Sequence, residues 1–264
     1  MHLSEIWIYP VKSLGGIRLE EALVQEKGLQ YDRRWMVVDE AGKFMTQRNH
    51  PSMALISTAI NASELVLSDH ENPGDYITVS LDPKSNDTGI SVQIWKDTVQ
   101  VMVAHDDVNA WLSTKLGKHV RLVRMFGDRN MNPDDAPDGV RLSFADDFPY
   151  LLTTEASLND LNTRLENTVN MSRFRPNFII SGTSPFEEDG WGCVRIGAVQ
   201  FLVSKPCERC VLINVDQSKG IRGVEPLKTL ASYRKENRKI IFGQNLIAQS
   251  YGIVRRGDLV EICS

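Results

Sequence analysis

Apolar side chains in the first hundred residues fall in short runs that are separated by polar turns. Apolar, β-branched or aromatic runs occupy residues 6–9, 35–38, 65–67, 76–79 and 91–95. Runs of this length, bounded by Pro, Gly, Asn, Asp and Ser, are typical of β-strands. Residues 35–46 predict a hairpin, because the glycine-bearing turn at 39–42 separates two apolar runs. The first part of the chain is therefore expected to consist mainly of strands.

Helical spacing of apolar residues begins only after residue 100. It occurs at 106–117 and again near 154–167, where Thr154 is a suitable N-terminal cap. A third helix is expected to start near Glu225-Pro226, because proline is favoured in a first helical turn. Strands are predicted at 178–180, 199–203, 211–213, 246–248 and 259–262, with a long loop at 127–140. Strands and helices do not alternate regularly, so a doubly wound parallel sheet is not expected.

These elements together predict a strand-rich α+β protein with few helices. The chain has 264 residues, which allows for about two domains and for a core that needs no disulfides. We place a β-barrel-like domain at 1–100 and a mixed domain at 101–264.

Composition and charge exclude several classes of function. The net charge is −4 and the isoelectric point is near 5.8, which argues against a basic protein that coats nucleic acid. No apolar run approaches the roughly 18 residues of a membrane span, and the N-terminus lacks the pattern of a signal peptide. We therefore expect a cytoplasmic protein with reduced thiols and without nucleic-acid or membrane partners.

The four cysteines include one closely spaced pair. Cys193 and Cys263 stand alone, whereas Cys207 and Cys210 form a Cys-x-x-Cys between two runs predicted as strands. A redox pair would prefer a helix after the first cysteine, and a structural zinc site would need a second pair of ligands. A single thiolate that binds a soft metal is a third interpretation, favoured by the adjacent Arg209. Two small buried residues in a strand turn are the fourth.

Basic residues stand at three predicted element boundaries. They are Lys12-Ser13 after the first strand, Asp32-Arg33-Arg34 before the second, and Phe174-Arg175-Pro176-Asn177 between a helix and a strand. Backbone amides are free at such boundaries, and arginine binds phosphate or carboxylate groups in a bidentate manner. Three such junctions in an acidic protein predict one anion-binding pocket; three separate surface ion pairs are the alternative.

Five short motifs occur in an order that resembles a known family. They are Tyr9-Pro10-Val11-Lys12-Ser13, Asp32-Arg33-Arg34-Trp35, Phe174-Arg175-Pro176-Asn177, Cys207-Glu208-Arg209-Cys210 and Phe242-Gly243-Gln244-Asn245. Together they are similar to the MOSC family, named for the C-terminal domain of molybdenum cofactor sulfurase, with its N-terminal β-barrel partner. The resemblance covers nearly the whole chain and is nearest to the amidoxime-reducing component group. It implies a β-barrel MOSC N-terminal domain followed by a MOSC β-barrel domain.

The resemblance also implies a cofactor and the residues that hold it. Members of this group bind the molybdenum cofactor, a pterin that carries a dithiolene and a phosphate. The metal ligand and catalytic thiolate would be Cys210, with Asp146 close to the metal as a second catalytic residue that could aid proton delivery. Pyridoxal phosphate binding is a further association of the family. The pterin or its phosphate would be held by Lys12, Ser13, Arg33, Arg175, Asn177 and Arg209.

The function implied by the resemblance is a molybdenum oxidoreductase. It would reduce small N-oxygenated compounds such as hydroxylamines, amidoximes or N-hydroxylated bases. Electrons would come from a separate ferredoxin-, flavodoxin- or haem-type protein, because no cysteines are spaced for an iron–sulfur cluster. A carrier that holds the cofactor or a sulfur atom without turnover is the alternative. Glu208 departs from the family pattern, and it would repel an anionic cofactor unless it turns outward.

Overall fold

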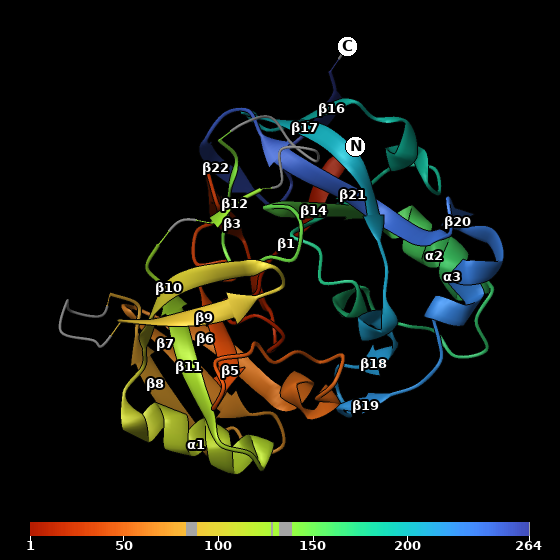
Figure 1. Ribbon diagram of the computed structural model, residues 1–264. Helices are drawn as coiled ribbons and strands as arrows, with labels where there is room; N and C mark the ends of the chain where they lie inside the picture. Colours follow the sequence, from red (N-terminus) through yellow and green to blue (C-terminus); the bar gives the residue numbers. More distant parts are fainter. Residues whose placement is uncertain (83–88, 128, 132–138, 264) are drawn as a thin grey trace.

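The computed structural model describes residues 1–82, 89–127, 129–131 and 139–263. Its largest sheet has nine strands, and it joins the start of the chain to the last third (Figure 1). In spatial order the path runs through β2 (Ile17–Leu19), β1 (His2–Ile8), β15 (Phe178–Ser181), β14 (Tyr150–Thr154), β21 (Lys239–Ala248), β17 (Val199–Glu208), β16 (Cys193–Ile196) and β23 (Val260–Ile262), with β20 (Lys235–Glu236) paired to β21.

Smaller sheets surround this one, and most of them use N-terminal strands. Four strands form the order β5 (Trp35–Asp39), β11 (Val120–Met125), β10 (Asp97–Val103) and β9 (Gly89–Ile94). The three-stranded sheets are β6 (Ile56–Asn61), β7 (Glu64–Asp69), β8 (Tyr76–Ser80) and β22 (Gly252–Arg255), β3 (Glu21–Gln25), β4 (Gly28–Leu29). Two ribbons pair β12 (Arg129–Asn130) with β13 (Arg141–Leu142) and β18 (Val215–Asp216) with β19 (Ile221–Arg222).

Helices are few, as expected. The α-helices are α1 (Asp106–Leu116), α2 (Glu155–Thr163) and α3 (Leu227–Tyr233). The 3₁₀ turns are η1 (Pro51–Leu55), η2 (Met171–Arg173), η3 (Glu187–Gly190) and η4 (Val211–Asn214). Thr154 caps α2 as predicted, because its hydroxyl accepts a hydrogen bond from the Ser157 amide at 3.2 Å. The strand-rich α+β prediction is confirmed. No helix among the described residues combines the length and apolar character that a bilayer crossing requires.

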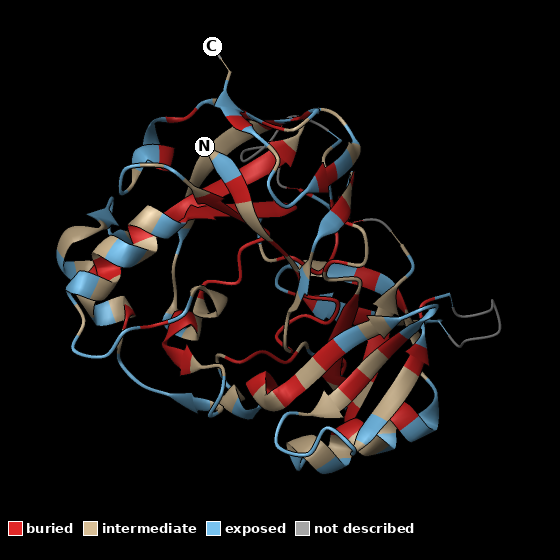
Figure 2. Cartoon of the chain, turned by 180° about the vertical axis from the view of Figure 1, so that it is seen from behind, coloured by how far each residue is buried: buried red, intermediate tan, exposed pale blue. Residues whose placement is uncertain are grey.

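Separate apolar cores hold the two halves of the molecule. Figure 2 shows buried residues concentrated along the strands and at the inner faces of the helices. In the large sheet, Tyr150, Phe178 and Phe201 pack with ring centroids 5.3–5.8 Å apart. In the N-terminal part, Val108 and Leu112 of α1 pack into a core with strand residues such as Leu122. Burial of each such side chain contributes about 2 kcal/mol to folding.

The prediction of a strand at 211–213 is wrong, and the error lies beside the cysteine pair. Residues Val211–Asn214 form the 3₁₀ turn η4, with Cys210 as its N-cap. β-Branched residues favour strands, but this turn buries Ile213 against Phe174 and Phe242. Tertiary packing therefore overrides the local preference of the sequence, and Cys210 stands at a sharp change of chain direction.

Three other boundaries differ from the prediction. The helix predicted at 154–167 ends at Thr163, and the short strand at 246–248 is the end of the ten-residue strand β21. Part of the predicted loop at 127–140 pairs as β12 and β13, and its residues 128 and 132–138 lie outside the described residues.

Candidate active site

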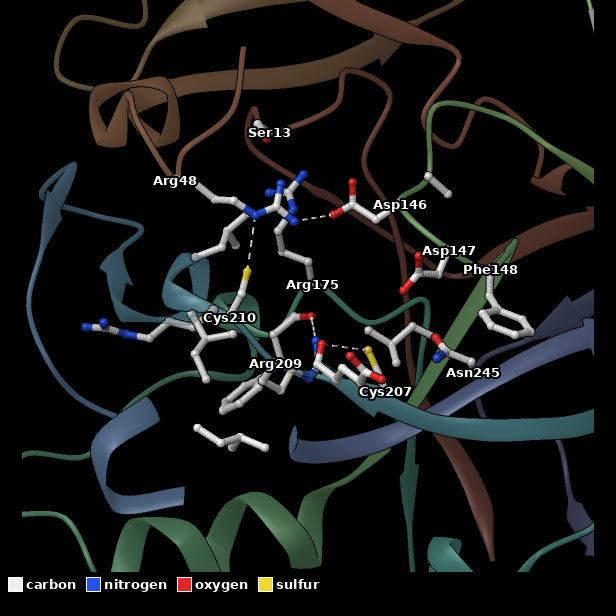
Figure 3. Close-up of a pocket in the computed structure, with 18 of the residues that line it drawn as sticks. Ser13, Arg48, Asp146, Asp147, Phe148, Arg175, Cys207, Arg209, Cys210 and Asn245 are labelled. Atoms are coloured by element: carbon white, nitrogen blue, oxygen red, sulfur yellow. Dashed lines mark hydrogen bonds and ion pairs between the residues drawn. The ribbon is translucent and has the colours of Figure 1, made fainter. Parts of the chain in front are cut away.

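All eight residues singled out in the sequence line one cavity of about 520 Å³, between the two halves of the chain. They are Lys12, Ser13, Arg33, Asp146, Arg175, Asn177, Arg209 and Cys210. Figure 3 shows several of them converging from distant parts of the sequence. The three basic junctions thus form one cationic pocket, as the sequence predicted, and Cys207 and Cys210 lie in its wall.

Cys210 contacts an arginine that the sequence analysis missed. The Nε atom of Arg48 donates to the Cys210 Sγ at 3.2 Å, and its Nη2 atom donates to Asp146 Oδ2 at 2.7 Å (Figure 3). Burial alone lowers the pKa of Arg48, but Asp146 and Cys210 outweigh it and hold that pKa above its usual range. Arg48 is therefore a permanent cation beside the sulfur. Its buried Nη1 atom has no hydrogen-bond partner among the described residues.

Asp146 is a fixed anion in this arrangement. Its carboxylate accepts hydrogen bonds from Lys12, from Arg48 and, at 3.2 Å, from the Trp95 indole. Burial raises the pKa of the Asp146 carboxyl, but Lys12 and Arg48 outweigh that effect and hold the pKa far below its usual range. Burial lowers the pKa of Lys12 to about 8, even though Asp146 opposes that shift. Lys12 is thus the group here that changes charge near neutral pH.

Arg175 carries a buried charge that forms no ion pair with a carboxylate among the described residues. It is 8% exposed, its Nη1 atom donates to the Leu14 carbonyl at 2.7 Å, and its Nη2 atom is buried without a described partner. Its guanidinium and that of Arg33 lie 4.1 and 4.6 Å from the centre of the Tyr9 ring. Because buried charges are costly unless they are paired, this site favours an anion in the cavity.

Three side chains in the wall of the cavity form hydrogen bonds to other groups of the protein: Arg33, Asn177 and Arg209. Arg33 binds Asp32 at 2.5 Å and donates to the Arg175 carbonyl at 3.0 Å, while Asn177 accepts from Arg33 at 3.2 Å. Arg209 donates twice to the Phe242 carbonyl and once to the Phe174 carbonyl, at 2.7–3.0 Å. These side chains hold the loops that form the wall of the cavity.

Several residues of the pocket adopt an unusual backbone conformation. Ser13, Arg33 and Arg175 have φ angles of 67°, 49° and 54°, in the left-handed region that non-glycine residues rarely adopt. Such strain persists only where the surroundings enforce it, and it clusters at functional sites. Gly243 has φ 77°, and a Cβ atom there would lie 2.5 Å from the Leu152 carbonyl oxygen. The Phe-Gly-Gln-Asn motif thus requires its glycine.

The structure also bears on Cys207 and Glu208. Burial raises the pKa of the Cys207 thiol, and the nearby Arg209 only partly offsets it, so Cys207 is a neutral thiol at neutral pH. The Glu208 carboxylate is 45% exposed and binds Lys239 at 2.7 Å, and both residues line the cavity, so Lys239 offsets the negative charge that Glu208 brings to its wall. No cluster of three or more His, Cys, Asp or Glu residues that could hold a metal occurs in the described part of the chain.

Comparison with known proteins agrees with this picture. A family model for the MOSC N-terminal beta barrel domain matches residues 1–119, and one for the MOSC domain matches residues 139–261. The chain belongs to the family of proteins that combine these two domains. Among solved structures, YUAD protein from Bacillus subtilis aligns over 98% of this chain and 93% of its own, at 11% identity and a TM-score of 0.42.

Two kinds of curated relative show where the chain stands within the family. Mitochondrial amidoxime-reducing component 1 is 33% identical in both Mus musculus and Homo sapiens, over 98% of this chain and 82% of each relative. Molybdenum cofactor sulfurase of Oryza sativa subsp. japonica is 35% identical over 98% of this chain, which spans only 33% of that larger protein. The chain is therefore homologous to the amidoxime-reducing component over most of its length and to one region of the sulfurase.

Proposed function

We propose that this protein binds the molybdenum cofactor and reduces N-oxygenated compounds. The observation that carries the proposal is the cavity, which joins the Cys210 thiol to guanidinium nitrogens of Arg48 and Arg175 that have no hydrogen-bond partner among the described residues. A soft thiolate suits molybdenum, and two buried donors without partners suit a phosphate-bearing pterin. Two homologues are named for the reduction of amidoximes, which are N-oxygenated compounds.

The residues divide into two groups by what they can offer the cofactor. Cys210 would be the metal ligand, while Arg175 and Lys12 would bind the phosphate or the pterin. Arg33, Asn177 and Arg209 would act indirectly, because their side chains already hold the loops on which Arg175 and Cys210 stand. When bound, the cofactor would supply two-electron chemistry for breaking an N–O bond.

Reduction of an N–O bond to release water also requires protons. Asp146, held ionised by two cations, has no proton to give near neutral pH. Lys12, with a pKa near 8, is protonated at pH 7, lines the cavity, and donates to Asp146 and to the Phe144 carbonyl. We therefore assign proton delivery to the Lys12–Asp146 pair, with Lys12 as the source and Asp146 as the group that orients it.

The proposal requires an electron donor and a location in the cell. We propose a separate ferredoxin-, flavodoxin- or haem-type donor, since no cysteine group fit for a cluster occurs in the described part of the chain. The cytoplasm is the compartment that the sequence supports.

A carrier of cofactor or sulfur is the rival function, and one observation favours it. Cys207 places a second, neutral thiol in the wall of the same cavity. The two functions differ in turnover. Protein from a cofactor-competent host should contain molybdenum and pterin, and should oxidise a chemical electron donor when an amidoxime is added. Molybdenum without turnover would favour the carrier, and zinc without molybdenum would exclude both.

A further inference from the structure

Trp95 occupies a position that its local sequence preference does not explain. It begins the two-residue turn between β9 and β10, in which Ile94 pairs with Asp97. Its φ angle is 53°, a conformation that such turns normally fill with Asn, Asp or Gly. A bulky aromatic residue at positive φ is a genuine outlier, and such outliers mark functional positions more often than neutral ones.

Contacts fix the Trp95 indole at the edge of the cavity. Its ring lies 5.0 Å from Phe44, tilted by 57°, and the Arg48 guanidinium lies 5.0 Å from its centre. Its Nε1 atom donates to Asp146 Oδ1 at 3.2 Å, and Arg48 links Asp146 to the Cys210 sulfur. Two side chains, Asp146 and Arg48, therefore connect the Trp95 ring to the Cys210 thiol.

The indole is nevertheless 43% exposed, although it lines the cavity. The unpartnered nitrogens of Arg48 and Arg175 lie buried, so the anion-binding groups are deep and the aromatic surface is at the rim. An anionic cofactor would occupy the deep part, which leaves the exposed ring to a second molecule that enters later. A flat π-system can stack on the exposed part of such a ring, and the removal of both apolar surfaces from water favours binding.

We infer that Trp95 is a substrate-specificity residue that stacks flat aromatic N-oxygenated compounds beside Cys210. The inference rests on the proposed function because it treats these compounds as substrates, but the stacking itself does not require turnover. Aliphatic hydroxylamines have no flat ring and gain nothing from Trp95. The protein should thus prefer an aromatic amidoxime to a small aliphatic one of equal reactivity.

Two substitutions separate stacking from structure. Trp95→Asn removes the ring but suits the left-handed turn, so the melting temperature should stay equal or rise. Trp95→Phe keeps an aromatic face and loses only the hydrogen bond to Asp146. Phe126→Asn is the matched control, because Phe126 is a 73% exposed aromatic residue that does not line this cavity.

Calorimetry measures the affinity for benzamidoxime and for acetamidoxime. KM and kcat for both compounds are measured on the molybdenum-loaded protein. Trp95→Asn should weaken benzamidoxime binding and raise its KM by roughly 3- to 10-fold relative to acetamidoxime, so the ratio of the two affinities should fall. Trp95→Phe should keep that ratio even if loss of the hydrogen bond to Asp146 lowers kcat for both compounds, and Phe126→Asn should match the parent protein. An equal loss for both ligands, or a loss of bound molybdenum in Trp95→Asn, would overturn the inference. Benzamidoxime binding without turnover would support stacking and refute only the proposed function.

A second inference concerns Cys193 and Cys263, which the sequence left as isolated residues. β16 and β23 are antiparallel, and their register of Val194 with Ile262 sets Cys193 opposite Cys263. The Cys263 amide donates to the Cys193 carbonyl at 3.0 Å, which defines a hydrogen-bonded cross-strand pair. The α-carbons of such a pair lie about 5.5 Å apart, within the range that a disulfide spans. Both thiols are half-buried and interact directly.

We propose that these two thiols form a reversible disulfide that ties the edge strand β23 to β16. With oxidised glutathione as the oxidant, the two thiols lose two protons and two electrons, one S–S bond forms, and glutathione's S–S bond breaks to give two thiols. Cβ atoms of hydrogen-bonded pairs lie farther apart than a disulfide prefers, so the bridge should be strained and easily reduced.

Peptide mapping by mass spectrometry after treatment with oxidised glutathione tests this bridge. A cross-linked peptide pair joining Cys193 to Cys263, 2 Da lighter than the two reduced peptides, is the expected product. Dithiothreitol should reverse it, and Cys193→Ser should abolish it. The oxidised protein should melt several degrees higher, because the bridge closes a long loop in the unfolded chain. Glutathione attached separately to each cysteine, or a bridge between protein molecules, would refute the proposal.

Discussion

Replacement of Arg175 by methionine tests whether a side chain of the cavity serves ligand binding rather than folding. Met has a similar length and removes the charge. The folded protein would lose one hydrogen bond to the Leu14 carbonyl and the contact with the Tyr9 ring. It would also lose a charge that is costly to bury, since burial and the nearby Arg33 both lower the pKa of Arg175. These effects oppose each other, so we expect the free energy of unfolding to change by no more than about 1 kcal/mol.

The effect of Arg175→Met on ligand binding should be much larger. A hydrogen bond from a charged donor to an anion contributes about 1.5–3 kcal/mol, which corresponds to a loss of affinity of roughly 10- to 100-fold. Binding of sulfate to the cofactor-free protein, measured by calorimetry, gives this value directly. Molybdenum content of protein from a cofactor-competent host gives the corresponding loss for the cofactor.

Arg209→Met is the matched control, because it also removes an arginine from the wall of the cavity. The Arg209 guanidinium donates to the carbonyls of Phe242 and Phe174, and both would lose these donors. We expect a destabilisation of about 3 kcal/mol, or a melting temperature lower by roughly 6–12 °C. If Arg175→Met lost stability as Arg209→Met does and bound sulfate normally, the distinction between the two arginines would be wrong.

Three further predictions concern other residues of the site. Cys210→Ala should abolish reductase activity and reduce molybdenum content, whereas Cys207→Ala should retain most of both; activity assays and metal analysis check this, and a reversed result would move the ligand to Cys207. Because Lys12 loses its charge as pH rises through about 8, sulfate affinity should fall several-fold between pH 7 and 9.5; the same titration on Lys12→Met should be flat, and a parallel decline there would point to another group. Gly243→Ala should destabilise the fold by about 3 kcal/mol, since a Cβ atom would meet the Leu152 carbonyl at positive φ; a urea denaturation curve identical to that of the parent would show that the strand can shift.

Most predicted residues of the pocket were recognised because they stand in local motifs at element boundaries. Arg48 has no such signal in the sequence. It lies 162 residues from Cys210, and only the packing of the N-terminal hairpin against the cavity brings the two side chains together. A sequence pattern records neighbours along the chain, so a cation supplied from a distant turn remains hidden until the fold is known.

The segment after the cysteine pair also departs from its local sequence preference. Val211, Leu212 and Ile213 are typical strand residues, yet they form a 3₁₀ turn that buries Ile213 and leaves Val211 41% exposed. The pairing of Cys193 with Cys263 could not be foreseen either, because it depends on the register of β16 with the edge strand β23. By contrast, α1 and the cap of α2 were predicted correctly, since both depend on interactions within a few residues.

The central claim is that the Cys210 sulfur binds molybdenum, and X-ray absorption at the molybdenum edge tests it most directly. Protein from a cofactor-competent host should be compared with Cys210→Ser, at matched metal content. The account predicts one fewer sulfur ligand on molybdenum in the variant, with the sulfurs of the pterin retained. An identical sulfur count in both proteins would contradict it.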